Sequence, residues 1–186
     1  MKLPARALEA PAVGPHVALE VVRLVGVLVV AVLLQTTVAP NVRILGAHPD
    51  FVLIFVVCVA LLRGAEIGAL FGFVAGGLVA IVLFEPAGIS AFVLVVIGYL
   101  AGRYAETADL SPGFAPLVTV LAGSLAGETM YALAQFLLDR QAPVYFLTTR
   151  VIVPLVILNA LLAAPVYVVV HWWLGGERHV GASEAR

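Results

Sequence analysis

One acidic side chain stands inside a long apolar segment of this sequence, where ionisable residues are rare. Glu128 is the only charged residue between Leu117 and Leu138. An acid at that depth in a bilayer is costly, so it is by default a candidate site that binds a substrate or a proton, or pairs with a partner. The other interpretation is a protonated acid that hydrogen-bonds to a neighbouring helix. No Lys or Arg lies at a matching depth in another segment.

Other polar residues inside apolar segments favour hydrogen bonds between helices, notably Gln35, Thr36, Thr37 and Asn159. The four histidines share no metal-ligand spacing, so we expect no metal and no cofactor. Ser90 and His171 are the best candidates for a serine protease pair, but they fall near opposite faces of the membrane. A nucleophile and its base must be within hydrogen-bond reach, so we predict a protein that is not an enzyme.

Glycine recurs at every fourth position after Arg63. The series is Gly64, Gly68, Gly72 and Gly76, and shorter versions occur at Gly98/Gly102 and Gly123/Gly127. Residues four apart lie on one face of a helix, and in lipid a stripe of small residues lets two backbones approach closely. The pattern predicts packing inside the protein. A groove for the transmembrane helix of a partner is a second interpretation, and the two are compatible.

The elements that position these residues are predicted to be transmembrane helices. The chain has 186 residues, of which 63% are hydrophobic and 11% charged, whereas soluble domains have about 45–50% apolar and about 25% charged residues. At about 20 residues per span, this length makes about six crossings. We therefore predict an all-α integral membrane protein, a compact bundle of about six transmembrane helices. A net charge of −1 gives no basic surface for nucleic acid.

The gaps between charged residues place the six spans. They run over 24–42, 51–62, 67–84, 86–102, 117–138 and 151–176, where the fifth contains Glu128. The second gap is short, and it crosses only if flanking residues extend toward the interfaces. A re-entrant pair made by the second and third segments is the alternative. The predicted organisation is a flexible cytoplasmic tail 1–20, a six-helix domain 21–175 and a flexible cytoplasmic tail 176–186.

The distribution of Lys and Arg predicts the orientation of the chain in the membrane. With the N-terminus inside, seven of them fall in cytoplasmic segments and three in external segments. Cytoplasmic loops carry the excess of Lys and Arg, so both termini are expected in the cytoplasm.

The order of these features resembles the MreD family, the rod shape-determining membrane proteins of bacteria. The resemblance covers about residues 24–173. Its motifs are Leu33-Leu34-Gln35-Thr36-Thr37, Gly46, Pro49-Asp50, Gly64, Gly72-Phe73, Gly76, Gly98 to Gly102, Asn159 and Pro165. One position departs from the family pattern: Ala80 stands where an aspartate is frequent, with Glu85 slightly further on.

The resemblance implies a non-enzymatic scaffold of the cell-wall elongation (rod) complex in the bacterial cytoplasmic (inner) membrane. It implies MreC as a partner, with RodA and an elongation transpeptidase, and MreB indirectly. It also implies a fold similar to the S-subunits of energy-coupling-factor transporters. The alternative function is therefore the substrate-binding membrane subunit of a small-molecule transporter, with Glu128 and Asn159 lining a pocket. Such a pocket needs several convergent polar groups, and few are available.

Overall fold

The computed structural model describes residues 15–43, 47–84, 87–107, 115–138 and 152–175. Within these residues it contains six α-helices and no β-strand, which confirms the predicted fold class. The helices are α1 (Pro15–Leu33), α2 (Phe51–Arg63), α3 (Ala65–Leu83), α4 (Ala87–Thr107), α5 (Ala115–Leu138) and α7 (Val153–Leu174). α1 continues through a π-helical turn, η2 (Leu34–Val38), and a 3₁₀ turn, η3 (Ala39–Asn41).

Five of the described helices are long and apolar enough to cross a membrane. The exception is α2, which has 13 residues. At 1.5 Å per residue it is about 20 Å long, whereas the hydrocarbon core of a bilayer is about 30 Å thick. At least one end of α2 therefore lies below the surface of the hydrocarbon layer.

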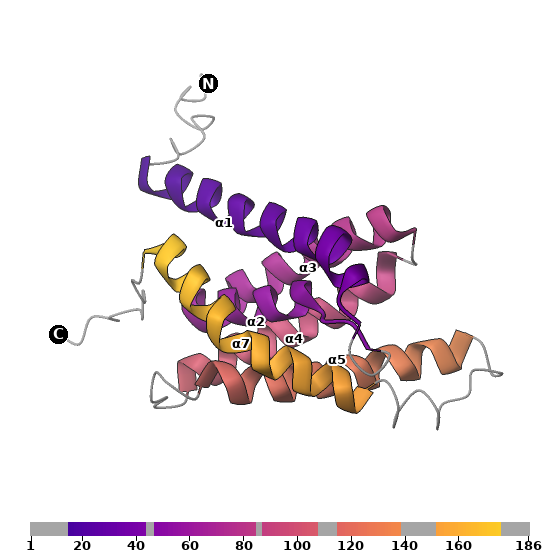
Figure 1. Ribbon diagram of the computed structural model, residues 1–186. Helices are drawn as coiled ribbons and strands as arrows, with labels where there is room; N and C mark the ends of the chain where they lie inside the picture. Colours follow the sequence, from indigo (N-terminus) through magenta and orange to yellow (C-terminus); the bar gives the residue numbers. More distant parts are fainter. Residues whose placement is uncertain (1–14, 44–46, 85–86, 108–114, 139–151, 176–186) are drawn as a thin grey trace, which may run out of the picture.

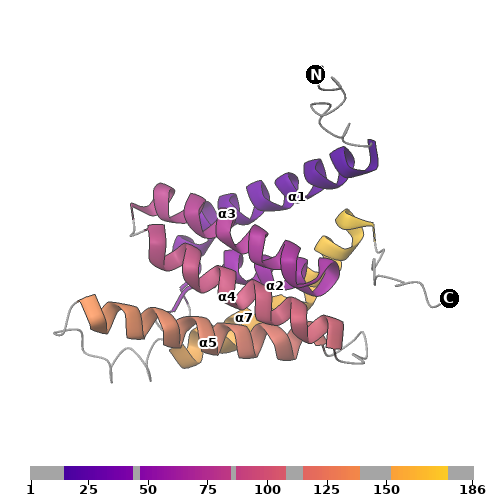
Figure 2. The ribbon, with the colours of Figure 1, turned by 180° about the vertical axis from the view of Figure 1, so that it is seen from behind.

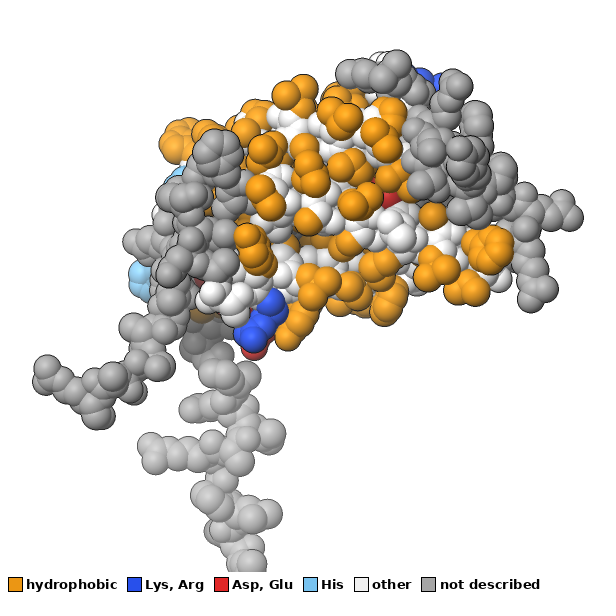
Figure 3. Space-filling view, turned by 90° about the horizontal axis from the view of Figure 1, so that it is seen from below, with side chains coloured by type: hydrophobic (Ala, Val, Ile, Leu, Met, Phe, Trp, Pro, Cys, Tyr) orange, Lys and Arg blue, Asp and Glu red, His pale blue; other side chains and the backbone are white. Residues whose placement is uncertain are grey.

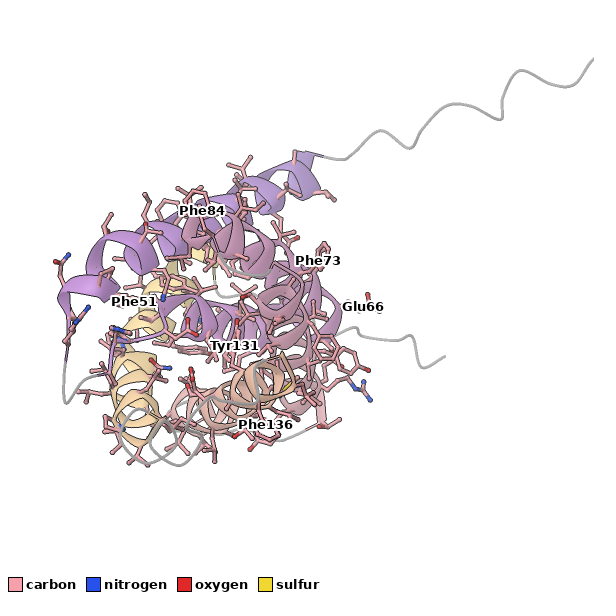
Figure 4. The ribbon with its side chains drawn as sticks, turned by 90° about the vertical axis from the view of Figure 1, so that its right-hand side faces the viewer. Phe51, Glu66, Phe73, Phe84, Tyr131 and Phe136 are labelled. Carbon is pink, nitrogen blue, oxygen red and sulfur yellow. The ribbon has the colours of Figure 1, made fainter. Side chains whose placement is uncertain are left out.

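α2 is the centre of the bundle. It contacts α1, α3, α4, α5 and α7, and all its residues from Phe51 to Leu62 are buried. Figures 1 and 2 show α2 between α1 on one side and α5 with α7 on the other, while α3 and α4 lie side by side. The view along the bundle in Figure 4 places Phe51 inside the ring of helices, and Phe73 and Phe136 outside it. A helix that is apolar on every face is expected in such a buried position.

The two ends of α2 define the two ends of the bundle. Arg63, its last residue, forms an ion pair with Glu20 near the start of α1. Gln35, near the other end of α1, accepts hydrogen bonds from the first residues of α2. α2 therefore runs between the two ends of the bundle that Gln35 and Glu20 define, and α3 returns. We refer to these as the Asp50 end and the Arg63 end.

The outer surface of the bundle is apolar. Side chains such as Leu70, Phe73 and Leu161 are more than half exposed, and Figure 3 shows that most side chains in the described, central part of the face seen from below are hydrophobic. Such a surface needs a cover of lipid or protein.

Some predicted features lie at the edges of the described ranges. α1 begins at Pro15, within the segment assigned to the N-terminal tail. Residues 1–14, the tail 176–186, Gly46 and Glu85 lie outside the described residues.

Candidate functional site: a polar cap on the buried end of α2

The start of α2 presents backbone N–H groups that need acceptors. The first N–H groups of any helix have no partner within the helix. In a bilayer, each unsatisfied polar group costs several kcal/mol, so irregular backbone at membrane depth must be buried in protein or face water. Pro49 and Ala47, in the non-helical segment before α2, are both buried. The acceptors must therefore come from the protein.

Gln35 and Asp50 supply three of these acceptor contacts. The Gln35 Oε1 atom accepts from the Phe51 N–H at 2.8 Å and from the Val52 N–H at 3.4 Å. The Asp50 Oδ1 atom accepts from the Leu53 N–H at 3.0 Å, which makes Asp50 the N-cap of α2. Aspartate is among the preferred N-cap residues because its carboxylate reaches the N–H three residues on.

Asn159 on α7 completes the arrangement. Its Oδ1 atom accepts from the Asp50 N–H at 2.9 Å, and its Nδ2 atom donates to the Ser124 Oγ atom of α5 at 3.0 Å. Asn159 and Ser124 are fully buried. We call Gln35, Asp50, Ser124 and Asn159 the cap cluster. It joins α1, α5 and α7 to the start of α2, so the end of the central helix is held from three sides.

The π-helical turn at the end of α1 carries Gln35. A π-helix accommodates an extra residue in its turn and is often found at functional sites. Thr36 and Thr37 donate their hydroxyls to the carbonyls of Val32 and Leu33 in the preceding turn. The Leu-Gln-Thr-Thr-Val segment thus satisfies its own hydroxyls locally, while the Gln35 amide reaches across to α2.

Glu128 lies next to the cap cluster. It follows Ser124 by four residues on α5, so both project from the same face of that helix. Glu128 is half-buried, one helical turn beyond Ser124 of the cap cluster. The structure therefore brings together Gln35, Asp50, Glu128 and Asn159, which are spread over more than 120 positions of the sequence, at the Asp50 end.

The glycines of α3 face α4, not the outside of the bundle. A Cβ atom built on Gly68 would stand 2.7 Å from the Gly98 carbonyl oxygen, and one on Gly76 would stand 2.6 Å from the Ala91 Cα atom. A Cβ on Gly72 would meet the Leu94 carbonyl. The backbones of α3 and α4 are therefore in direct contact, and the stripe is covered within the chain.

Gly64 and Gly102 close the same interface at the Arg63 end. Gly64 is the single residue between α2 and α3, with φ 90° and ψ −178°, a conformation that is essentially restricted to glycine. It belongs to a turn rather than to the helical stripe that its spacing predicted. A Cβ on Gly102 would meet Ala65 and Gly64. Glu106 then caps α3, because its Oε1 atom accepts from the Ala65 N–H at 2.8 Å.

Arg63 joins three helices at the opposite end from the cap cluster. Its Nη2 atom donates to the Leu174 carbonyl oxygen at 2.8 Å, and its Nε atom lies 3.2 Å from Glu20 Oε1. Arg23 donates to the same carbonyl at 3.4 Å. Carbonyls at a helix C-terminus lack partners and attract cations. Arg63 therefore satisfies the end of α7, and the side chain is 9% exposed.

The other predicted positions do not form a reactive site. Ser90 is buried near the start of α4, and its carbonyl lies near Gly76 in the Asp50 half of α3. His171 is exposed in the last turn of α7, at the Arg63 end. The two residues therefore lie toward opposite ends of the bundle. No group of His, Cys, Asp and Glu suited to a metal occurs in the part of the chain that the structure describes. Ala80 is fully buried on α3.

Sequence reasoning missed Ser124, Glu106 and the capping role of Arg63. Ser124 could have been found from the sequence, because it lies one helical turn before Glu128 and on the same face of the helix. The partners of Glu106 and Arg63 are a backbone N–H and a carbonyl on other helices, and no spacing in the sequence indicates them.

Comparisons with known proteins point in one direction. The family model of the rod shape-determining protein MreD matches residues 17–175. That range contains the cap cluster, the glycines of the α3–α4 interface and almost the whole of every described helix. No curated protein and no solved structure matches the chain significantly. Because the family model covers most of the sequence, the chain belongs to the MreD family of rod shape-determining membrane proteins.

Proposed function

We propose that this protein is a non-enzymatic scaffold of the cell-wall elongation complex and controls cell shape through MreC and the peptidoglycan synthase. Membership of the MreD family carries the proposal, because that family determines rod shape. The cap cluster supports it. The polar groups that converge inside the bundle bond to one another and to the backbone of α2. They stabilise one arrangement of helices, as a scaffold requires.

The proposed direct partner is MreC, with RodA and an elongation transpeptidase in the same complex and MreB linked indirectly. The apolar outer surface supports contact within the membrane, since exposed side chains on α1, α5 and α7 can pack against helices of other proteins. Helix association in lipid depends on close van der Waals packing, so a rigid bundle offers a better surface than a mobile one.

Co-purification from membranes tests this proposal. The tagged chain, expressed with its genomic neighbours in a rod-shaped bacterium, should retain MreC and the elongation synthase in mild detergent. A tagged multi-pass protein of another complex serves as the control. Recovery of neither partner above that control, from a chain that remains folded, would contradict the scaffold function.

The proposed location is the bacterial cytoplasmic membrane with both termini in the cytoplasm. Among the described residues, Arg23, Arg63 and Arg103 lie at the Arg63 end and Arg43 at the other. By the positive-inside rule, this distribution supports the Arg63 end as the cytoplasmic one.

Cysteine labelling tests the orientation cleanly, because the native Cys58 is fully buried. His48 and Thr107 are exposed at opposite ends of the bundle. In intact cells whose outer envelope admits the reagent, an impermeant thiol reagent should label His48→Cys and spare Thr107→Cys. The reverse pattern would invert the topology.

The alternative function, a substrate-binding subunit of a transporter, would require polar groups of the cap cluster to be available to a ligand. A binding subunit needs polar groups that are free to meet a ligand, whereas Gln35 and Asn159 are engaged in the bonds described above. Calorimetry on the purified protein with water-soluble vitamins distinguishes the two functions. Tight binding would replace the scaffold proposal.

A further inference from the structure

The first half of α1 is attached to the bundle in a different way from the second half. None of residues 16–26 is buried, and among them Leu24 is the only apolar side chain that packs against the core. The buried positions of α1 follow at once, at Val27, Leu28 and Ala31. Figures 1 and 2 show the start of α1 projecting away from the other helices, nearest to the end of α7. We call residues 16–25 the arm.

Polar contacts hold the arm in place of apolar burial. Glu20 Oε1 lies 3.2 Å from Arg63 Nε. The Arg23 guanidinium donates to the Leu174 carbonyl oxygen at 3.4 Å, and the Trp173 Nε1 atom donates to the Arg23 carbonyl oxygen at 3.3 Å. Both hydrogen bonds are longer than the usual range of about 2.7–3.2 Å. The ion pair between Glu20 and Arg63 is therefore the strongest contact of the arm.

Gly26 lies at the boundary between the arm and the buried half of α1. Glycine weakens a helix more than any residue except proline, because ordering it costs the most backbone entropy. A Cβ atom built on Gly26 would lie 3.4 Å from the Trp173 Cζ2 atom, an ordinary van der Waals contact. Space alone therefore does not require glycine there. Its position, at the point where burial begins, suits a hinge.

We propose that the arm swings about Gly26 and that the Glu20–Arg63 ion pair is its latch. With the latch closed, the Arg63 side chain is 9% exposed. Removing a guanidinium from water is costly, and an open arm returns Arg63 to water and headgroups, which offsets the loss of the ion pair. Release of the arm uncovers Arg63 and the end of α7, so the latch controls access to this end of the bundle. The motion belongs to the chain alone and requires no partner.

Distances between two spin labels, measured by pulsed electron paramagnetic resonance on the full chain in lipid nanodiscs, test this motion. Cys58, the one cysteine of the chain, is replaced by alanine in this background. The labels are attached at Val22→Cys on the arm and Leu100→Cys on α4, two positions that are more than half exposed. Glu20→Gln should raise the population of a second, longer distance by about fivefold, the effect of a partly exposed ion pair. An unchanged distribution would overturn the proposal.

Two controls separate the latch from a general effect of charge or of helix movement. Glu66→Gln removes an acid at the same end of the bundle, in the first turn of α3, and should leave the distances unchanged. A shift as large as that of Glu20→Gln would refute the latch. Labels at Val29→Cys and Leu100→Cys report on α1 beyond the hinge and should not respond to Glu20→Gln. If they move together with the Val22 label, all of α1 shifts and there is no hinge at Gly26.

Gly26→Ala tests the hinge itself. The added methyl group fits against Trp173, and alanine stiffens the helix, so this change should cancel most of the effect of Glu20→Gln. Equal opening with glycine and with alanine would refute Gly26 as the hinge. If Glu20→Gln does not fold, raised ionic strength on the native latch decides the question, because salt screens a partly exposed ion pair. A larger population of the longer distance at high salt supports the latch, and no change overturns it.

Discussion

Removal of the Asn159 amide should destabilise the bundle by more than the net energy of two hydrogen bonds, because it leaves a buried N–H group without an acceptor. In Asn159→Ala, the Asp50 N–H loses its acceptor, and an unsatisfied buried donor costs about 1–3 kcal/mol. The bond to Ser124 is also lost, and interhelical hydrogen bonds in membranes average about 0.6 kcal/mol. The sum predicts a loss of about 2–4 kcal/mol in the free energy of unfolding.

The assay is unfolding of the purified protein in mixed micelles by increasing mole fractions of a denaturing detergent. The two tryptophans of the chain report the transition by fluorescence. Thr129→Ala is the matched control, because the Thr129 hydroxyl bonds only to the Leu125 carbonyl of its own helix. It should cost less than about 0.5 kcal/mol, as surface changes usually do.

A double-mutant cycle separates the two bonds of Asn159. Ser124→Ala removes only the bond within the α5–α7 pair, so its coupling with Asn159→Ala should be about 0.6 kcal/mol. Most of the destabilisation by Asn159→Ala should therefore remain when Asn159→Ala is made in the Ser124→Ala variant. If Asn159→Ala costs no more than Thr129→Ala, the start of α2 does not depend on the cap cluster, and the reasoning is refuted.

Three further predictions follow from the same contacts. Gly72→Ala should lower the free energy of unfolding by about 3 kcal/mol, because the added Cβ would meet the Leu94 carbonyl. Gly77 has open space around it, so Gly77→Ala should be neutral or raise the free energy of unfolding by up to about 1 kcal/mol. The same unfolding assay measures both. Gln35→Leu should cost about 2–4 kcal/mol, since it leaves two N–H groups of α2 without acceptors; a loss below 0.5 kcal/mol would contradict this. Glu128→Gln should restore rod shape in a deletion strain and Glu128→Lys should not, because an amide matches a protonated acid in shape; failure of the glutamine variant would show that the carboxyl itself is needed.

The sequence was sufficient to predict the fold class and the family, because both depend on features that persist over many residues. Apolar segments of span length identify membrane helices wherever they occur. The spacing of Gly68, Gly72 and Gly76 identifies one face of a helix. It does not identify which helix covers that face, since any small-residue surface accepts a neighbouring backbone. The structure places α4 there.

The central position of α2 was harder to predict from the sequence. A gap of twelve uncharged residues is compatible with a short span or a buried core helix, and hydropathy does not distinguish them. The difference lies in how the helix end is satisfied. Gln35 and Asn159 are 124 positions apart, and they meet only because α1 and α7 flank the same helix start. Likewise, the backbone conformation of Gly64 follows from the near-direct joining of α2 to α3, which a regular spacing of glycines conceals.

The cap on α2 has a consequence for biosynthesis. A 13-residue segment is too short to be retained in a bilayer by its own hydropathy, and Asn159, which accepts from the Asp50 N–H, is translated more than 100 residues later. In the α2–α3 hairpin, the Asp50 N–H therefore lacks its acceptor until α7 has been made and packed. Chains arrested before α7 should consequently expose the segment around Asp50 to proteolysis, while the completed chain protects it. The cap on the central helix is then completed only when α7 packs against it, late in the assembly of the bundle.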